Sequence, residues 1–127
     1  MDDRHELVVL VSRLGAWLDA KSPDEGRVLF TEDAEAHTLG GVAKGVEALI
    51  EQARRGHRVP TQHFTTDPLV EVSGDSATIG ANLLVVFAHE DGPRLLGERY
   101  ELEAVRAADG WRISRVETRL IWEVANV

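Results

Sequence analysis

The second half of the sequence contains three closely spaced turn signals, and they constrain the fold more than any other feature. Each signal combines glycine with other turn-forming residues. The three signals are Ser73-Gly74-Asp75, Glu90-Asp91-Gly92-Pro93 and Ala108-Asp109-Gly110. The strand-forming runs that they separate are 61–72, 77–88, 96–107 and 111–124. Because consecutive strands joined by short turns pair antiparallel, this pattern predicts a curved four-strand antiparallel meander.

The last turn sets a register for the final hairpin. If Ala108-Asp109-Gly110 forms a three-residue loop, residue 102 faces residue 116 and residue 100 faces residue 118. One face of the pair is then apolar and should point to the interior; its residues are Tyr100, Leu102, Ala104, Val116 and Leu120. The other face is charged, with Arg99, Glu101, Glu103, Arg115, Glu117 and Arg119. Ion pairs on such a face contribute little individually.

The first half of the chain predicts three helices and a short strand. Residues 4–20 have apolar side chains at helical spacing, and these are Leu7, Leu10, Val11, Leu14, Trp17 and Leu18. A second helix at about 23–30 is preceded by Ser22, with Pro23 and Glu25 completing a capping box. Its inward residues are expected to be Val28, Leu29 and Phe30.

A short strand at 34–39 is expected before the Gly40-Gly41 turn. The third helix should run from Val46 to about Arg55 and bury Val46, Leu49, Ile50 and Ala53. The 127 residues fit one α+β domain, 1–127, in which three N-terminal helices pack on the meander.

Composition excludes several classes of function. The formal net charge of −8 argues against nucleic-acid binding, because an acidic surface repels phosphate. The chain has no cysteine, and its histidines lack metal-ligand spacing, so we expect no metal site; no cofactor is implied. Its N-terminus is charged, and no segment approaches the ~20 apolar residues of a membrane helix. We therefore expect a cytoplasmic protein that binds neither nucleic acid nor membrane.

The run from Leu83 to Ala88 is apolar on both faces. In so small a sheet, a strand is buried on both sides only when something covers each side. The helices can cover one face, and a second subunit is the simplest cover for the other. The sequence thus predicts a homo-oligomer, most simply a homodimer.

Among the five histidines, His63 is the candidate for chemistry, since histidine is the usual general base near neutral pH. It lies near the start of the first long strand, although a histidine there also suits a structural role. His5 and His89 lie beside charged or turn residues and should be exposed, and His57 fits a helix-capping role. The direction of His37 is left open. Asp19, at the end of the first helix, is the best carboxylate partner and is either solvated or held by a cation.

Several segments, taken together, resemble the SnoaL-like branch of the nuclear-transport-factor-2-like superfamily over nearly the whole chain. The matching segments are 29–34, 45–50, 61–64, 74–77, 100–106 and 109–113. The resemblance implies a cone in which helices close over a concave sheet, with a pocket at one end and a convex face through which many members dimerise. Members include dehydratases, dehydrochlorinases, ketosteroid isomerases, polyketide cyclases, epoxide hydrolases and binders without catalytic activity.

Thr61-Gln62-His63-Phe64 is similar to the segment that carries the catalytic histidine of scytalone dehydratase. Hexachlorocyclohexane dehydrochlorinase and bile-acid 7α-dehydratase have a comparable histidine, and the aspartate that partners it matches Asp19. The two tyrosines that hold a water in scytalone dehydratase correspond to Leu18 and Thr38, and its second histidine corresponds to Ala88. These departures exclude scytalone dehydratase itself. Leu102 stands where the related family pattern often has an aspartate, and this difference implies a more apolar pocket.

The leading hypothesis is an enzyme for elimination, isomerisation or cyclisation of a small hydrophobic molecule. His63 would act as the general base and Asp19 would orient it. The expected substrate-binding residues are Tyr100, Trp17, Thr38, Leu84, Val86 and Arg106. The alternative is a ligand-binding or assembly module with the same pocket and no chemistry.

Overall fold

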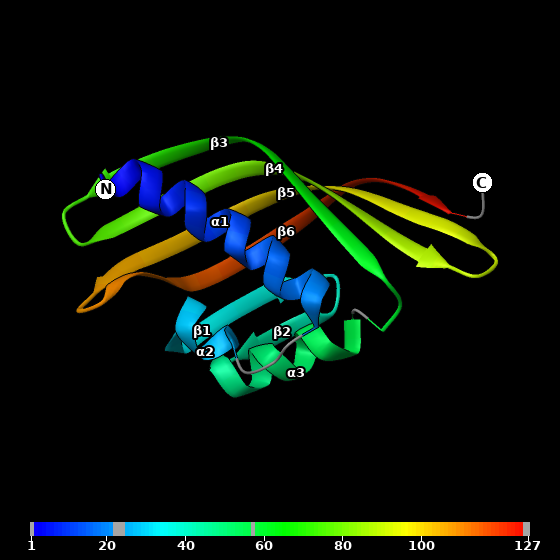
Figure 1. Cartoon of the computed structure of the whole chain (residues 1–127), viewed down its shortest axis with the longest axis horizontal. Coiled ribbons are helices and arrows are strands. Elements are labelled where there is room, and N and C mark those ends of the chain that lie inside the picture. Colours follow the sequence, from blue (N-terminus) through cyan, green and yellow to red (C-terminus); the bar gives the residue numbers. More distant parts are fainter. Residues whose placement is uncertain (1, 22–24, 57, 126–127) are drawn as a thin grey trace.

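The computed structural model describes residues 2–21, 25–56 and 58–125. Along the chain, the elements are α1 (Asp3–Ala20), α2 (Gly26–Leu29), β1 (Phe30–Thr38), β2 (Gly41–Lys44), α3 (Val46–Gly56), β3 (Thr61–Ser73), β4 (Ser76–His89), β5 (Gly92–Ala107) and β6 (Gly110–Ala125). The predicted α+β architecture with three N-terminal helices and a four-strand meander is confirmed (Figure 1). The second helix is one turn rather than the two expected, and Ser22 and Pro23 lie outside the described residues.

The six strands form one open sheet in the order β2-β1-β6-β5-β4-β3. The meander β3–β6 is antiparallel, as predicted, and β1 and β2 form a further hairpin. β1 joins the meander by running parallel to β6, a pairing that the sequence analysis did not foresee. This pairing places the β1–β2 hairpin beside β6, and α3 packs on that hairpin (Figure 1).

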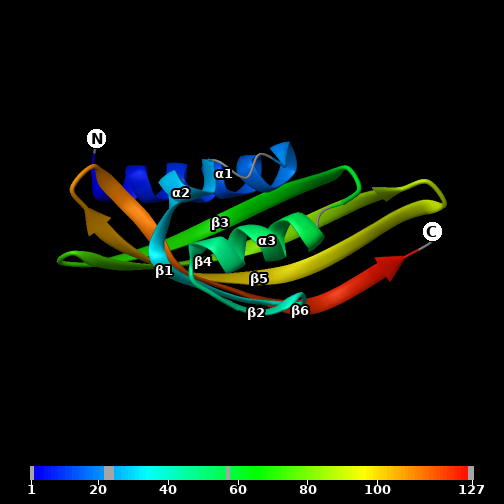
Figure 2. The same cartoon turned by 90° about the horizontal axis from the view of Figure 1, so that it is seen from below.

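The helices all lie on one face of the sheet, with α1 crossing the strands (Figures 1 and 2). The apolar residues of α1 and α3 pack there against the inward side chains of the strands and form the core. Leu29 and Phe30 are buried as expected, but Val28 is 61% exposed because the single turn of α2 directs it outward. The opposite, convex face of the sheet is not covered by any described element.

The β5–β6 hairpin reaches its predicted register by a different route. Ala107 pairs with Gly110, so the loop contains two residues instead of three. Ser114 is an additional residue in β6, and this bulge restores the predicted pairing of residue 102 with 116 and of 100 with 118. A second bulge follows between Leu120 and Trp122. Leu120 directly precedes this second bulge and is 37% exposed rather than part of the interior.

Candidate active site

The C-terminal end of α1 lies directly against the start of β3. Lys21 ends the helix in the left-handed conformation (φ 57°) and donates its backbone N–H to the carbonyl of Trp17. The two elements are close at Gly15, where a Cβ would be in van der Waals contact with the Cβ of His63 at 3.4 Å. The last turn of α1 therefore brings Asp19 to the first residues of β3.

Asp19 holds His63 through both its backbone and its ring. The imidazole Nδ1 lies 2.6 Å from Asp19 Oδ1, and the backbone N–H of His63 donates to Asp19 Oδ2 over 2.9 Å. The Thr61 hydroxyl also donates to Asp19 Oδ1 over 3.1 Å. The Thr61 hydroxyl oxygen in turn accepts a hydrogen bond from Lys21 Nζ over 3.2 Å. The aspartate is thus fixed from several directions, and the orientation of the imidazole follows from it.

The environment favours the neutral form of the His63 ring. Burial lowers its pKa from the usual 6.5, and the hydrogen bond and charge of Asp19 oppose that effect only in part. Because Asp19 is an acceptor, the proton of the neutral imidazole belongs on Nδ1. The lone pair is then on Nε2, which is the nitrogen that a general base uses.

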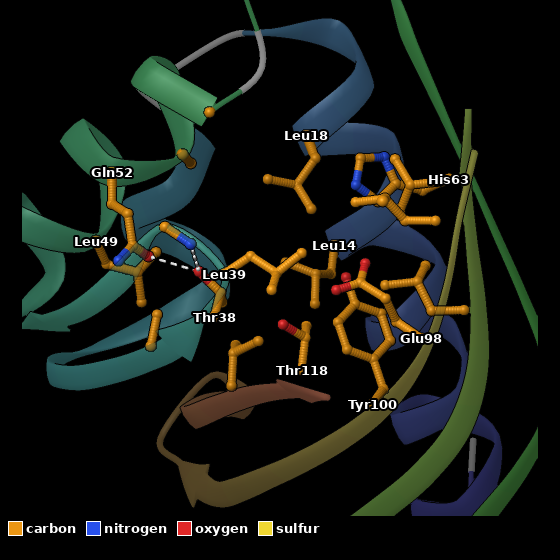
Figure 3. Close-up of a pocket in the computed structure, with 18 of the residues that line it drawn as sticks. Leu14, Leu18, Thr38, Leu39, Leu49, Gln52, His63, Glu98, Tyr100 and Thr118 are labelled. Carbon is orange, nitrogen blue, oxygen red and sulfur yellow. Dashed lines mark hydrogen bonds between the residues drawn. The ribbon is translucent and has the colours of Figure 1, made fainter. Parts of the chain in front are cut away.

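A cavity of about 330 Å³ lies between the helices and the concave face of the sheet (Figure 3). This volume suits a small organic molecule. The walls are mostly apolar, and the apolar lining includes Leu14, Trp17, Leu18, Phe30, Leu49, Leu83, Val85, Phe87 and Leu96. The polar side chains in the lining are Thr38, Gln52, His63, Arg94, Glu98, Tyr100 and Thr118. The imidazole that Asp19 orients is therefore part of the cavity wall.

Tyr100 and Thr38 line the cavity as the sequence predicted. Tyr100 is 2% exposed, and burial together with the charges of Glu98 and Asp19 raises the pKa of its phenol, which stays protonated. Thr38 accepts a hydrogen bond from the backbone N–H of Gly40 at the opposite side of the cavity (Figure 3). Both residues belong to the cavity lining, and both have a hydroxyl group.

Glu98 is the functional candidate that the sequence analysis missed. It is only 8% exposed, it lines the cavity, and burial raises the pKa of its carboxyl above the usual 4.5. A signal for it was present, because Glu98 is two residues before Tyr100 and side chains two apart in a strand share a face. The predicted inward face of this strand began at Tyr100 and continued toward the β5–β6 turn, so it did not include residue 98.

The sequence matches the SnoaL-like domain family over residues 1–117. The chain belongs to the SnoaL-like family. No curated protein sequence matches it significantly. Membership agrees with the concave sheet and helices described above, while the chemistry of a member is set by the residues of its pocket.

Solved structures similar to this SnoaL-like chain include both enzymes and proteins named only by fold. A nuclear-transport-factor-2-like protein from Novosphingobium aromaticivorans is 30% identical, with a TM-score of 0.77 over 94% of this chain and 82% of that one. A putative scytalone dehydratase from the same organism is 20% identical (TM-score 0.85; 95% and 85% covered). Hexachlorocyclohexane dehydrochlorinase type 3 from Novosphingobium barchaimii is 22% identical (TM-score 0.81; 98% and 91% covered). At these lower identities, the last two show the fold alone.

Two side chains predicted to line the pocket of this family member lie on the other face of the sheet. His63 pairs with Val85, so Val85 and Leu83 share the concave face with it. Leu84 and Val86 alternate with them and therefore point to the convex face. Apolar character did not distinguish the two faces, because the strand is apolar on both.

Arg106 was also predicted to contribute to the site, and the structure places it away from the cavity. Its guanidinium pairs with Asp3 over 2.7 Å and Asp75 over 3.1 Å. It also lies over the ring of Trp111, with the guanidinium carbon 4.5 Å from the ring centroid. Arg106 therefore ties α1 to the β3–β4 and β5–β6 turns instead of binding substrate.

Replacing Arg106 with alanine is expected to reduce stability in a pH-dependent way. Arg106 and Trp111 lower the pKa of Asp3 from 3.8 to about 2. The ion pair therefore stabilises the folded state fully above pH 3.8, where the Asp3 carboxyl is ionised in the unfolded chain as well. This stabilisation is lost as the pH falls through about 2. Urea denaturation of wild type and Arg106→Ala at neutral pH and near pH 2 measures this.

The stability difference between wild type and Arg106→Ala should narrow toward pH 2. Arg13→Ala, on the exposed surface of α1, is the matched control and should show no such narrowing. A difference that stays constant over this range would contradict the assigned role of the ion pair.

Within the described ranges, no group of three or more histidine, aspartate or glutamate side chains is arranged to hold a metal ion. None of the described helices is long and apolar enough to span a bilayer.

His37 lies half-buried, with its Nε2 3.0 Å from Glu35 and 2.9 Å from Arg115. His5 and His89 are exposed, and His57 lies outside the described residues.

Proposed function

We propose that this chain is a cofactor-independent enzyme of the lyase, isomerase or cyclase type that acts on a small, mostly apolar molecule. The observation that carries the proposal is the 2.6 Å contact of His63 Nδ1 with Asp19 Oδ1 at the wall of an apolar cavity. The names of two similar structures, a putative scytalone dehydratase and a hexachlorocyclohexane dehydrochlorinase, favour lyase chemistry.

In the proposed mechanism, Nε2 of His63 removes a proton from a carbon atom of the bound molecule. Asp19 keeps the Nδ1–H tautomer and stabilises the imidazolium that forms. The apolar walls exclude water from the carbanion-like transition state and hold the carbon close to the base. The same proton abstraction begins an elimination, a double-bond isomerisation or a cyclisation, so the proposal covers these three reaction types.

The proposal is tested by proton exchange in D₂O. Small ketones, hydroxy ketones and halogenated rings are screened for binding through the fluorescence of Trp17, which lines the cavity. Each compound that binds is then incubated with the protein in D₂O and examined for deuterium at carbon or for an elimination product. Binding with neither result for any bound compound would contradict catalysis and favour the ligand-binding alternative.

We further propose that the protein is a homodimer formed through the convex face of the sheet. Register places Phe64, Leu84 and Trp122 in neighbouring positions on this face, and Val86, Leu95 and Val124 in the next row. The ring of Trp122 fills the space that a Cβ at residue 97 would occupy, and Trp122 is 47% exposed. An apolar patch of this kind marks an interaction surface. A cytoplasmic location remains a prediction of the sequence.

Light scattering coupled to size-exclusion chromatography should give the mass of two 14.0 kDa chains. Leu84→Asp should convert the dimer to monomers, because a carboxylate cannot be buried there without a partner. The exposed Val28→Asp, on the helical side of the molecule, is the matched control and should leave the mass unchanged. A wild-type protein that remains monomeric at micromolar concentration would contradict the dimer.

A further inference from the structure

We propose that Glu98 is a second catalytic residue, a neutral carboxyl group that donates its proton to the carbonyl oxygen of the substrate. The inference rests on the proposed role of His63 as the base, and it narrows the substrate class to small apolar carbonyl compounds with a proton on the adjacent carbon. Nothing in the His63–Asp19 pair alone selects that class, since a base acts equally on a halogenated ring.

Glu98 occupies a position that few glutamates take. It is 8% exposed, while Glu101 and Glu103 on the same strand are exposed on the convex face. Its neighbours in the cavity lining are Leu96, Leu83 and Tyr100. A buried glutamate destabilises a fold relative to an apolar residue of similar size, so its presence in a small-molecule cavity favours a role in binding or chemistry.

The surroundings favour the protonated form of Glu98. Burial raises the pKa of the carboxyl, and the Thr118 hydroxyl and the charge of Arg94 oppose this only in part. Arg94 has partners of its own, because its guanidinium pairs with Glu123 and lies 5.7 Å from the centroid of the Phe87 ring. A neutral carboxyl is a hydrogen-bond donor, whereas an ionised one only accepts.

Glu98 and His63 line the same cavity from strands that are not adjacent, because β4 lies between β3 and β5. His63 pairs with Val85 on β4, and Val85 pairs with Leu96 on β5, two residues before Glu98. Two strand spacings separate β3 from β5, about 10 Å. Figure 3 shows the Glu98 carboxyl beside the ring of Tyr100, below the imidazole of His63. A small carbonyl compound between these groups would present a C–H bond to the base and the adjacent carbonyl oxygen to the donor.

The proposed step is balanced in atoms and charge. Nε2 of His63 takes the proton from the carbon next to the carbonyl, and the electron pair of that C–H bond forms a carbon–carbon double bond. The π pair of the carbonyl moves to its oxygen, which takes the proton of Glu98. The products are the enol, the imidazolium of His63 and the carboxylate of Glu98. Tyr100, whose phenol stays protonated beside Glu98, supplies a second donor to the same oxygen.

The first experiment uses acetophenone with a ¹³C-labelled carbonyl as a probe of the cavity. Its infrared carbonyl band reports hydrogen bonding directly. Saturating acetophenone should show a band at lower wavenumber in wild type than in Glu98→Leu. Glu101→Gln, which changes an exposed carboxyl on the same strand, is the matched control and should give the wild-type band. Equal bands in wild type and Glu98→Leu, or no bound acetophenone, would overturn the proposal.

Affinity gives an independent reading of the same hydrogen bond. α-Methylstyrene has the shape of acetophenone with a CH₂ group in place of the oxygen. Wild type should prefer acetophenone, and Glu98→Leu should reduce that preference by about tenfold, the value of one good hydrogen bond. A preference that does not depend on residue 98 would contradict the assigned donor.

Protonation and turnover separate this inference from the proposed function. The infrared difference between wild type and Glu98→Gln should contain the band of a protonated carboxyl at a pH above 4.5. Glu98→Gln, which can donate a hydrogen bond but cannot transfer a proton, should bind the ketone and lose the alkaline limb of the rate profile.

If His63→Ala abolishes turnover while Glu98→Gln does not change it, the inference fails and the proposed function stands. If ketones bind through Glu98 and no proton exchanges, the proposed function fails.

Discussion

Replacing His63 with alanine should reduce turnover by about a thousandfold, the usual contribution of a general base. The ring forms part of the cavity wall, and its loss removes Nε2 while Asp19 and the backbone hydrogen bond at residue 63 remain. Ligand affinity should change little, because most of the contact surface is apolar and comes from other residues. Rates of deuterium exchange or elimination, compared with affinities from Trp17 fluorescence, measure the two effects separately.

His89→Ala is the matched control for this substitution. His89 is exposed at the end of β4 and is not part of the cavity lining, so its replacement should leave both turnover and affinity at wild-type values. Undiminished turnover in His63→Ala would reject the mechanism. A loss of affinity as large as the loss of turnover would show that the ring acts in binding alone.

Replacing Asp19 with asparagine should reduce turnover by about two to three orders of magnitude, within the range that a general base contributes, while the protein stays folded. The asparagine amide can donate to Nδ1, and the imidazole then carries its proton on Nε2, where a base needs the lone pair. The substitution also removes the charge and hydrogen bond by which Asp19 raises the pKa of His63. Initial rates against pH measure the lower plateau and the position of the acid limb.

The acid limb is expected below pH 6.5 in wild type, since His63 must lose its proton to act and its pKa is lowered. In Asp19→Asn it should move to still lower pH. Asp33→Asn, which changes an exposed carboxyl on β1, serves as the control and should keep the wild-type profile. An Asp19→Asn enzyme with the wild-type rate would show that the aspartate has a structural role alone.

Local signals in the sequence predicted the meander and helices well. Turn residues separate the long strands, and apolar spacing in 4–20 and 46–55 follows the helical period, so each element could be recognised from its own residues. The parallel pairing of β1 with β6 has no such signal, because it joins segments about 80 residues apart. The bulge at Ser114 was equally hidden, since it compensates for a loop that is one residue shorter than expected.

The site was predictable where a residue type is rare and unpredictable where only orientation matters. His63 was recognisable as a scarce titratable residue at the start of a strand, and Asp19 as a carboxylate at a helix end. Leu84 and Val86 were misplaced because an apolar strand does not show which face turns inward. Glu98 was missed because its charge suggests an exposed position. Its position two residues before the inward-facing Tyr100 places it on the same face of β5, and it lines the cavity.

The proposed chemistry depends on Asp19 holding a neutral His63 with its lone pair on Nε2 at the cavity wall. Nitrogen-15 NMR of the histidine side chains tests it most directly, with the His63 signals assigned by comparison with His63→Ala. We expect a proton on Nδ1 at neutral pH and an imidazole pKa below 6.5. A proton on Nε2 in the neutral ring, or a pKa above 6.5, would contradict it.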